Sequence, residues 1–131
     1  MEILVSQAQG RVPVTVFHVR GEINASSYVQ FQAEAERAIQ AGTTHLLIDL
    51  AETPYISSAG LRALTYAYNL LRDKSGEGQE SVGPGLRDGT YRSPHLKLLD
   101  PTPQVLRVLD ASGYDMFLES HTDYQQAVDS F

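Results

Sequence analysis

The sequence predicts one α/β domain in which helices pack against a mixed β-sheet. Strand-like and helix-like segments alternate along the chain, which is the order typical of α/β folds. The first two strand-like segments follow each other closely, as in a hairpin, whereas helical segments separate the later ones and favour parallel pairing. A length of 131 residues, 42% of them apolar, fits one domain of ordinary size.

Two β-strands open the chain. Residues 2–9 (EILVSQAQ) and 12–21 (VPVTVFHVRG) are β-type segments, and the short Gly10 and Arg11 connection between them predicts an antiparallel hairpin. Alternate residues of the second strand share one face of the sheet. The residues on this face are Val12, Val14, Val16 and His18.

An amphipathic helix and a central strand come next. Residues 24–42 carry apolar side chains at helical spacing, and we expect Asn24 to cap the start of the helix and Gly42 its end. The segment THLLIDL then contains a short apolar run, which is typical of a strand covered on both faces. We therefore place a central strand at Leu46–Leu50.

The second half of the chain continues the alternation. A helical pattern begins at Ser58 and places Leu61, Leu64, Tyr68 and Leu71 on one face. The remaining expected elements are a strand at 95–100, a helix at 102–113, a strand at 116–120 and a helix at 122–131.

Residues 75–94 interrupt this order with five of the ten glycines and two of the six prolines of the chain. This composition predicts a glycine-rich loop insertion with too few apolar residues to offset the entropy of ordering it. Its glycines match no phosphate-binding motif, so nucleotide binding is not expected there.

Composition excludes several classes of function. A net charge of −6 and a pI near 5.0 argue against a nucleic-acid binder, which needs a basic face. The absence of cysteine excludes disulfides and thiolate metal sites. No signal-peptide pattern and no apolar run long enough to cross a membrane occur in the sequence, so we expect a cytoplasmic protein with no direct membrane contact.

Two adjacent serines, Ser57 and Ser58, lie between the central strand and the next helix. Pro54 disfavours helix at Thr53, so the helix starts no earlier than about Ile56. The serines thus lie at a helix N-terminus beyond the carboxyl end of a strand, where α/β proteins often bind ligands and where anions are favoured. Serine is also a preferred N-cap, and position alone leaves both explanations open.

Catalysis is a weaker hypothesis. The segment ISSAG lacks the first glycine of GxSxG because Ile56 stands there, and the four histidines are isolated in sequence. Asp49 is expected to hold the loop after its strand. We predict no catalytic residue, no metal site and no cofactor. A small hydrolase that uses Ser57 or Ser58 as its nucleophile is kept as an alternative hypothesis.

Three segments carry a family resemblance. LLIDLAETPYISSAGLRAL resembles, without gaps, the central motif of STAS-domain proteins, the bacterial anti-sigma-factor antagonists. VRGEIN, at 19–24, is similar to the family's Gly-Glu-Leu-Asp turn, and LLDPTPQVLRVLDASGYDMFLE resembles its C-terminal strand, helix and strand. The resemblance implies a single STAS domain over 1–131, interrupted only by the insertion.

The resemblance also implies a function. Antagonists of this family bind a serine kinase that is also an anti-sigma factor, phosphorylation of one serine breaks the complex, and a PP2C-type phosphatase restores it. The phosphoacceptor position falls on Ser58. The implied partner-binding residues are Gly21, Glu22, Asn24, Tyr55, Ser57, Ser58, Ala59, Gly60 and Arg62.

Two acids of the family pattern are replaced here. Ser57 and Asn24 stand where many antagonists have Asp. These replacements keep a second hypothesis open, namely a non-phosphorylated STAS subunit of a larger signalling or lipid-transport assembly. The sequence implies no particular oligomeric state.

Overall fold

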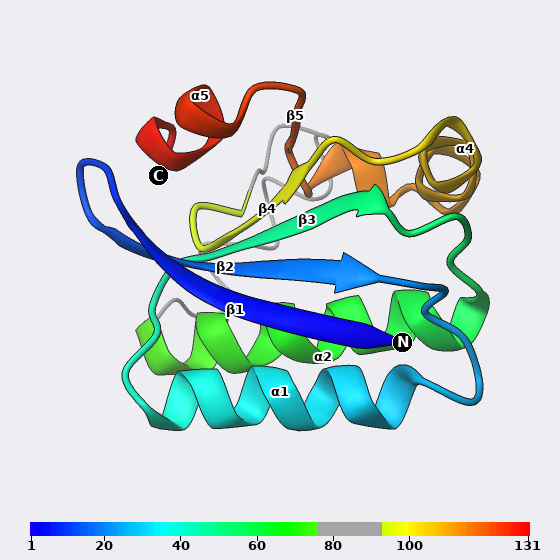
Figure 1. The fold of residues 1–131 in the computed structure, drawn as a ribbon, viewed down its shortest axis with the longest axis horizontal. Helices are drawn as coiled ribbons and strands as arrows, with labels where there is room; N and C mark the ends of the chain where they lie inside the picture. Colours follow the sequence, from blue (N-terminus) through cyan, green and yellow to red (C-terminus); the bar gives the residue numbers. More distant parts are fainter. Residues whose placement is uncertain (76–92) are drawn as a thin grey trace.

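A computed structural model describes residues 1–75 and 93–131 and contains, within them, one five-stranded mixed sheet in the order β1-β2-β3-β4-β5 (Figure 1). β1 and β2 form the expected antiparallel hairpin, and β3, β4 and β5 each join the preceding strand in parallel. The strands are β1 (Glu2–Gln9), β2 (Pro13–Arg20), β3 (Leu46–Glu52), β4 (Leu96–Leu99) and β5 (Ser120–His121). The predicted α/β fold with a mixed sheet is confirmed.

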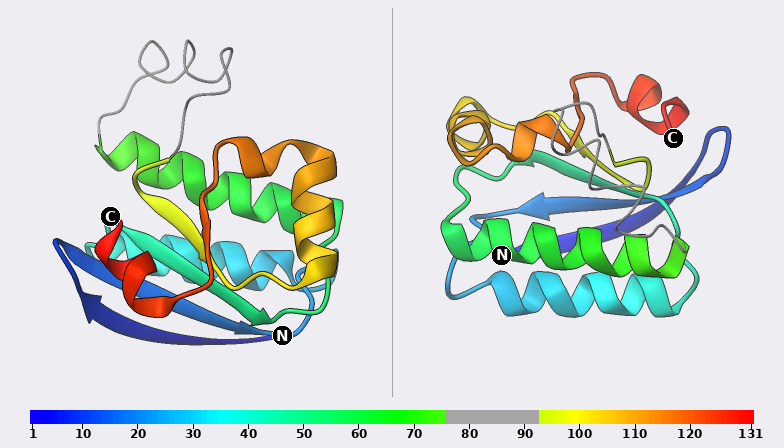
Figure 2. Two further views of the ribbon diagram at one scale, coloured as in Figure 1. Left: turned by 90° about the horizontal axis from the view of Figure 1, so that it is seen from above. Right: turned by 180° about the vertical axis from the view of Figure 1, so that it is seen from behind.

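Helices cover the two faces of the sheet unequally. The long helices α1 (Tyr28–Gln40) and α2 (Ser58–Ser75) lie side by side on one face, whereas the short α5 (Tyr124–Asp129) lies on the other (Figures 1 and 2). α4 (Pro103–Ser112) and the 3-10 turn η1 (Tyr114–Met116) extend the layer of α1 and α2, because their apolar residues join the same core.

The main core forms between the sheet and the α1–α2 layer. Phe17 of β2 and Phe31 of α1 are fully buried and meet edge to face, with ring centroids 6.0 Å apart. Ile48 and Leu64 are buried in the same cluster, as the alternation in β3 and the helical spacing in α2 predict. A smaller cluster lies under α5 and consists of Val14, Val16, Leu47, Leu99, Ala127 and Val128.

Two elements differ from the prediction by more than two residues at a boundary. α1 begins at Tyr28 with Ser27 at its N-cap position, because residues from Asn24 onward form a turn before the helix. The strand expected at 116–120 is wrong over most of its length. Gly113 adopts a left-handed conformation with φ of +81° and ends α4, and the chain then makes η1 before the two-residue β5.

The expected insertion at 75–94 lies largely outside the described residues. At its borders, Ser75 is still the last residue of α2, and Ser93 is buried, with its backbone N–H donating to the Phe117 carbonyl at 2.8 Å. Within the described ranges, no helix is both long enough and apolar enough to span a bilayer.

Candidate functional site

The site predicted from the sequence lies where two loops join at the carboxyl ends of β2 and β3. The backbone N–H of Ile23 donates to the Tyr55 carbonyl at 3.2 Å, and that of Ser57 donates to the Ile23 carbonyl at 3.0 Å. Ile23 and Ile56 form an isolated parallel bridge, and both side chains are fully buried. The 21–24 loop and the 53–57 loop are therefore held together directly in front of α2.

The two serines have different roles at the start of α2. Ser57 precedes the helix and is half-buried, and its Oγ accepts a hydrogen bond from the backbone N–H of Gly60 at 3.3 Å, as an N-cap residue does. Ser58 is the first residue of α2 and is exposed. No hydrogen bond to its hydroxyl is found within residues 1–75 and 93–131. Ser58, as predicted, lies in the first turn of the second long helix.

Ala59 and Gly60 face the protein's own interior. Ala59 is buried, and a Cβ atom added to Gly60 would lie 2.4 Å from the Ile23 carbonyl oxygen and 2.5 Å from Ile56 Cγ1. Only glycine allows α2 to approach the 21–24 loop this closely. The packing of α2 on its own loops therefore explains both small residues.

Hydrogen bonds within the 21–24 loop hold it in place. Asn24 Oδ1 accepts from the backbone N–H of Ser26 at 3.0 Å, and the Ser27 hydroxyl donates to the Glu22 carbonyl at 2.8 Å. Gly21 has a φ of +112°, a conformation that side chains disfavour. Asn24 thus orders the turn in front of α1, and Glu22 remains exposed beside it.

α4 contributes residues that the sequence did not predict for this site. Tyr55, with 43% of its surface exposed, borders a shallow groove of about 320 Å³ whose other wall is formed by Gln104, Arg107, Val108 and Ala111. Thr102 links the two elements, because its hydroxyl donates to the Thr53 carbonyl at 3.2 Å. No sequence signal pairs these residues with Tyr55, since they lie about fifty positions apart.

A cluster of titratable side chains lies toward the ends of β2 and β3, with His18 at its centre. Its Nδ1 lies 2.7 Å from Asp49 Oδ2, and its Nε2 lies 2.5 Å from Glu52 Oε2. The hydrogen bonds with Glu52 and with Asp49 raise the pKa of His18 above its ordinary value. Asp49 Oδ1 also accepts from the backbone N–H of Ala51 at 3.0 Å; since Ala51 is still part of β3, this hydrogen bond lies within the strand and not in the loop after it, where it was expected.

The hydrolase hypothesis would need a general base beside Ser57 or Ser58. In the part of the chain that the structure describes, no hydrogen bond joins a histidine to Ser57 or Ser58. Nucleophilic catalysis requires such a partner. What the site offers chemically is an exposed serine, Ser58, at a helix N-terminus. The two joined loops in front of it contain the exposed residues Glu22 and Tyr55, and Arg62 is exposed one turn further along α2.

Comparisons with known proteins bear on the family of the chain and on its fold. The family model for the STAS domain matches residues 5–77. BtrV of Bordetella bronchiseptica, provisionally assigned as an anti-sigma factor antagonist, is 28% identical over 96 residues, which are 73% of this chain and 67% of BtrV.

Solved structures share the fold. An anti-sigma factor antagonist from Mycobacterium paratuberculosis superposes with a TM-score of 0.71 at 20% identity, covering 97% of this chain and 90% of that one. The Bacillus cell fate determinant SpoIIAA in its phosphorylated form gives a TM-score of 0.64 at 16% identity, covering 98% of this chain and 97% of that one.

Proposed function

The chain belongs to the STAS domain family, and from this premise we propose that it is an anti-sigma-factor antagonist regulated by phosphorylation of Ser58. In this proposal it binds an anti-sigma-factor serine kinase and thereby releases the sigma factor. The observation that carries the proposal is the difference between the two serines. Ser57 is engaged as the N-cap, whereas the Ser58 hydroxyl is exposed and available to a kinase.

The fold can accept a phosphate on Ser58. A phosphoserine carries a charge of about −1.5 to −2 at pH 7 and three acceptor oxygens. The first-turn N–H groups and the positive end of the α2 dipole favour a negative charge by about 0.3–1 kcal/mol at an exposed site. Phosphorylation would therefore leave the domain folded.

The same phosphate would be costly inside an interface. The exposed side chains of Glu22 and Tyr55 belong to the two loops in front of α2, and a partner that covers these loops would also cover a phosphate on Ser58. Burying a charge without a counter-charge is strongly unfavourable. The modification would thus release the kinase, and a PP2C-type phosphatase would restore binding by removing the phosphate.

The remaining predicted partner-binding residues have supporting positions in this proposal. Three of these residues are half-buried, so that part of each remains accessible to a partner: Gly21, Asn24 and Ser57. Ala59 and Gly60 lie beneath it and hold α2 against the 21–24 loop.

One observation favours a second candidate function. Neither position 24 nor position 57 is acidic; the Asn24 side chain is hydrogen-bonded to the turn that follows it, and the Ser57 side chain is hydrogen-bonded to the first turn of α2. A kinase that recognises its substrate through acids at these positions would find none here. The second candidate is therefore a STAS subunit that binds its partner without being phosphorylated.

A binding experiment separates the two candidates. The chain is titrated with each anti-sigma-factor kinase of the source organism in the presence of ADP. The proposal expects wild type and Ser58→Ala to bind one of these kinases and Ser58→Asp to lose binding by at least about 100-fold, which corresponds to about 2.7 kcal/mol.

The matched control is Ser120→Asp, which adds the same charge at an exposed position of β5. This variant is expected to bind like wild type. If Ser58→Asp binds as well as Ser120→Asp, the surface around Ser58 is not the kinase-binding surface.

A further inference from the structure

The two edges of the sheet differ in how well they are protected. At one edge, β5 has only two residues, and α5 follows it directly. At the other, β1 extends over Glu2–Gln9 and pairs, within residues 1–75 and 93–131, with β2 alone. Its register with β2 is uninterrupted from end to end. β1 therefore presents a long, regular row of backbone groups that another strand can pair with.

The outer edge of β1 also lacks the features that usually prevent such pairing. Ile3–Gln9 contains no charged residue and no proline, whereas exposed edges are typically protected by lysine, proline or a bulge. Leu4 and Val5 are 50% and 48% exposed, and as neighbours in a strand they project to opposite faces of the sheet. Both faces of the edge thus expose a large apolar side chain.

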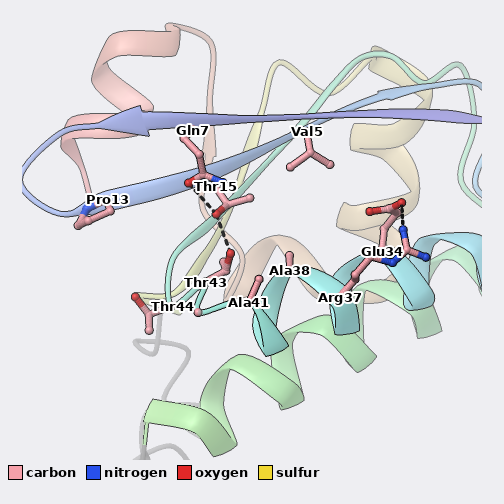
Figure 3. A pocket seen from close by; sticks show the side chains of 11 residues that line it. Val5, Gln7, Pro13, Thr15, Glu34, Arg37, Ala38, Ala41, Thr43 and Thr44 are labelled. Atoms are coloured by element: carbon pink, nitrogen blue, oxygen red, sulfur yellow. Dashed lines mark hydrogen bonds and ion pairs between the residues drawn. The ribbon is translucent and has the colours of Figure 1, made fainter.

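A cavity of about 510 Å³ lies under the same edge (Figure 3). Val5 and Gln7 line it from β1, Ala38 lines it from α1, and Ala41 lines it just after the end of α1. Figure 3 shows that α1 faces the underside of β1 across this space instead of packing against it. A strand added beside β1 would bring its own inward-facing side chains toward this cavity.

We propose that the chain forms a homodimer in which two β1 strands pair antiparallel about a two-fold axis perpendicular to the sheet. A second copy suits this edge because the exposed apolar residues of one copy meet those of the other, and an isologous contact closes without further growth. The proposal uses a surface other than the one around Ser58 and does not depend on the proposed function.

The symmetry restricts the register. A two-fold axis perpendicular to the sheet keeps a given residue on the same face in both copies. Residues directly opposite each other in an antiparallel pair also point to the same face. The register must therefore place one residue opposite its own copy. Val5 on the axis gives a ladder over Glu2–Ala8, with Val5 facing its copy on the cavity side. Leu4 then lies opposite Ser6 and diagonal to the second Leu4 on the other face. Glu2 lies opposite Ala8, so no like charges meet.

Single cysteines test this register, since the chain contains no cysteine of its own. Residues directly opposite in an antiparallel pair have Cβ atoms about 4.5–5.5 Å apart, close to disulfide geometry. Under mild oxidation we expect Val5→Cys to form a covalent dimer at least about tenfold faster than Leu106→Cys, a control exposed to 43% on α4.

Sedimentation velocity tests the dimer without cross-linking. A strand-edge contact is smaller than a standard interface, so we expect wild type to dimerise with a dissociation constant of about 10–100 μM. Val5→Lys should raise this constant at least about tenfold, as lysine protects natural edges, while Leu106→Lys should not change it. Circular dichroism of each variant establishes that it is folded.

Three results would overturn the proposal. The first is a wild-type chain that stays monomeric up to about 1 mM, well above the expected constant. The second is cross-linking of Val5→Cys no faster than of Leu106→Cys. The third is a monomer whose β1 amides become protected from hydrogen exchange only when the kinase is added, which would assign the edge to a strand of that partner.

Discussion

Replacing Gly60 by Ala tests how α2 is positioned against the 21–24 loop. Gly60 lies in the first turn of α2, and in a helix free of other contacts this substitution stabilises by about 1 kcal/mol, because alanine is the better helix former. Packing and helix propensity therefore predict opposite signs for the change in stability.

The structure decides which effect is larger. The new Cβ would lie 2.4 Å from the Ile23 carbonyl oxygen, which is backbone and cannot move without shifting the loop. Overpacking of this kind typically costs about 1–3 kcal/mol. Taking the upper half of that range, because the contact is with backbone, and subtracting about 1 kcal/mol for helix propensity leaves a net cost of about 1–2 kcal/mol. For a domain of this size, 1 kcal/mol corresponds to about 4 °C in Tm, so we expect Gly60→Ala to melt about 4–8 °C below wild type.

The assay is thermal unfolding followed by circular dichroism, together with urea denaturation. Arg62→Ala, an exposed residue of the same helix, is the control and should change stability by no more than about 0.5 kcal/mol. A Gly60→Ala variant that is as stable as wild type, or more stable, would refute the packing argument, since helix propensity alone would then account for the result.

Four further variants probe the two serines and the His18 cluster. Ser57→Ala removes the N-cap and should lower the free energy of unfolding in urea by about 0.5–2 kcal/mol, whereas Ser58→Ala should leave it unchanged. Ser58→Asp should stay within about 1 kcal/mol of wild type in thermal melts. The pKa of His18 is raised in the folded state above its ordinary value of about 6.5. The stability that wild type gains over His18→Gln should therefore be complete below about pH 6.5 and lost as the pH rises through the folded-state pKa of His18. Urea titrations at several pH values measure this stability, and an NMR titration of His18 measures its pKa. An equal difference at pH 5.5 and pH 9 would contradict the role of Asp49 and Glu52.

Local patterns in the sequence were sufficient for most of the fold. The hairpin followed from the short Gly10–Arg11 connection, and β3 from its apolar run. The start of α2 followed from Pro54 and the serines, because proline and N-cap residues act on their immediate neighbours. These signals depend on residues only a few positions apart, and the structure agrees with them.

Two predictions failed at turns, where a local hydrogen bond or a left-handed glycine outweighs the cap or strand pattern, and one neighbour was missed because it lies far away in the sequence. Asn24 has the chemistry of an N-cap, but Ser27 bonds back to the Glu22 carbonyl and delays α1 by one turn. Met116 and Phe117 suggested a strand, yet the left-handed Gly113 leads the chain into η1. Arg107 faces Tyr55 only because α4 packs beside the loop, which no local pattern reveals.

The central claim concerns one hydroxyl, and site-specific phosphorylation tests it most directly. Wild type, Ser57→Ala and Ser58→Ala are incubated with each anti-sigma-factor kinase of the source organism and ATP, and the tryptic peptide ending at Arg62 is sequenced by tandem mass spectrometry. We predict a single phosphate on Ser58 in wild type and in Ser57→Ala, and none in Ser58→Ala. A phosphate on Ser57, or no phosphate with any of these kinases, would contradict the account and favour a STAS subunit that binds its partner without phosphorylation.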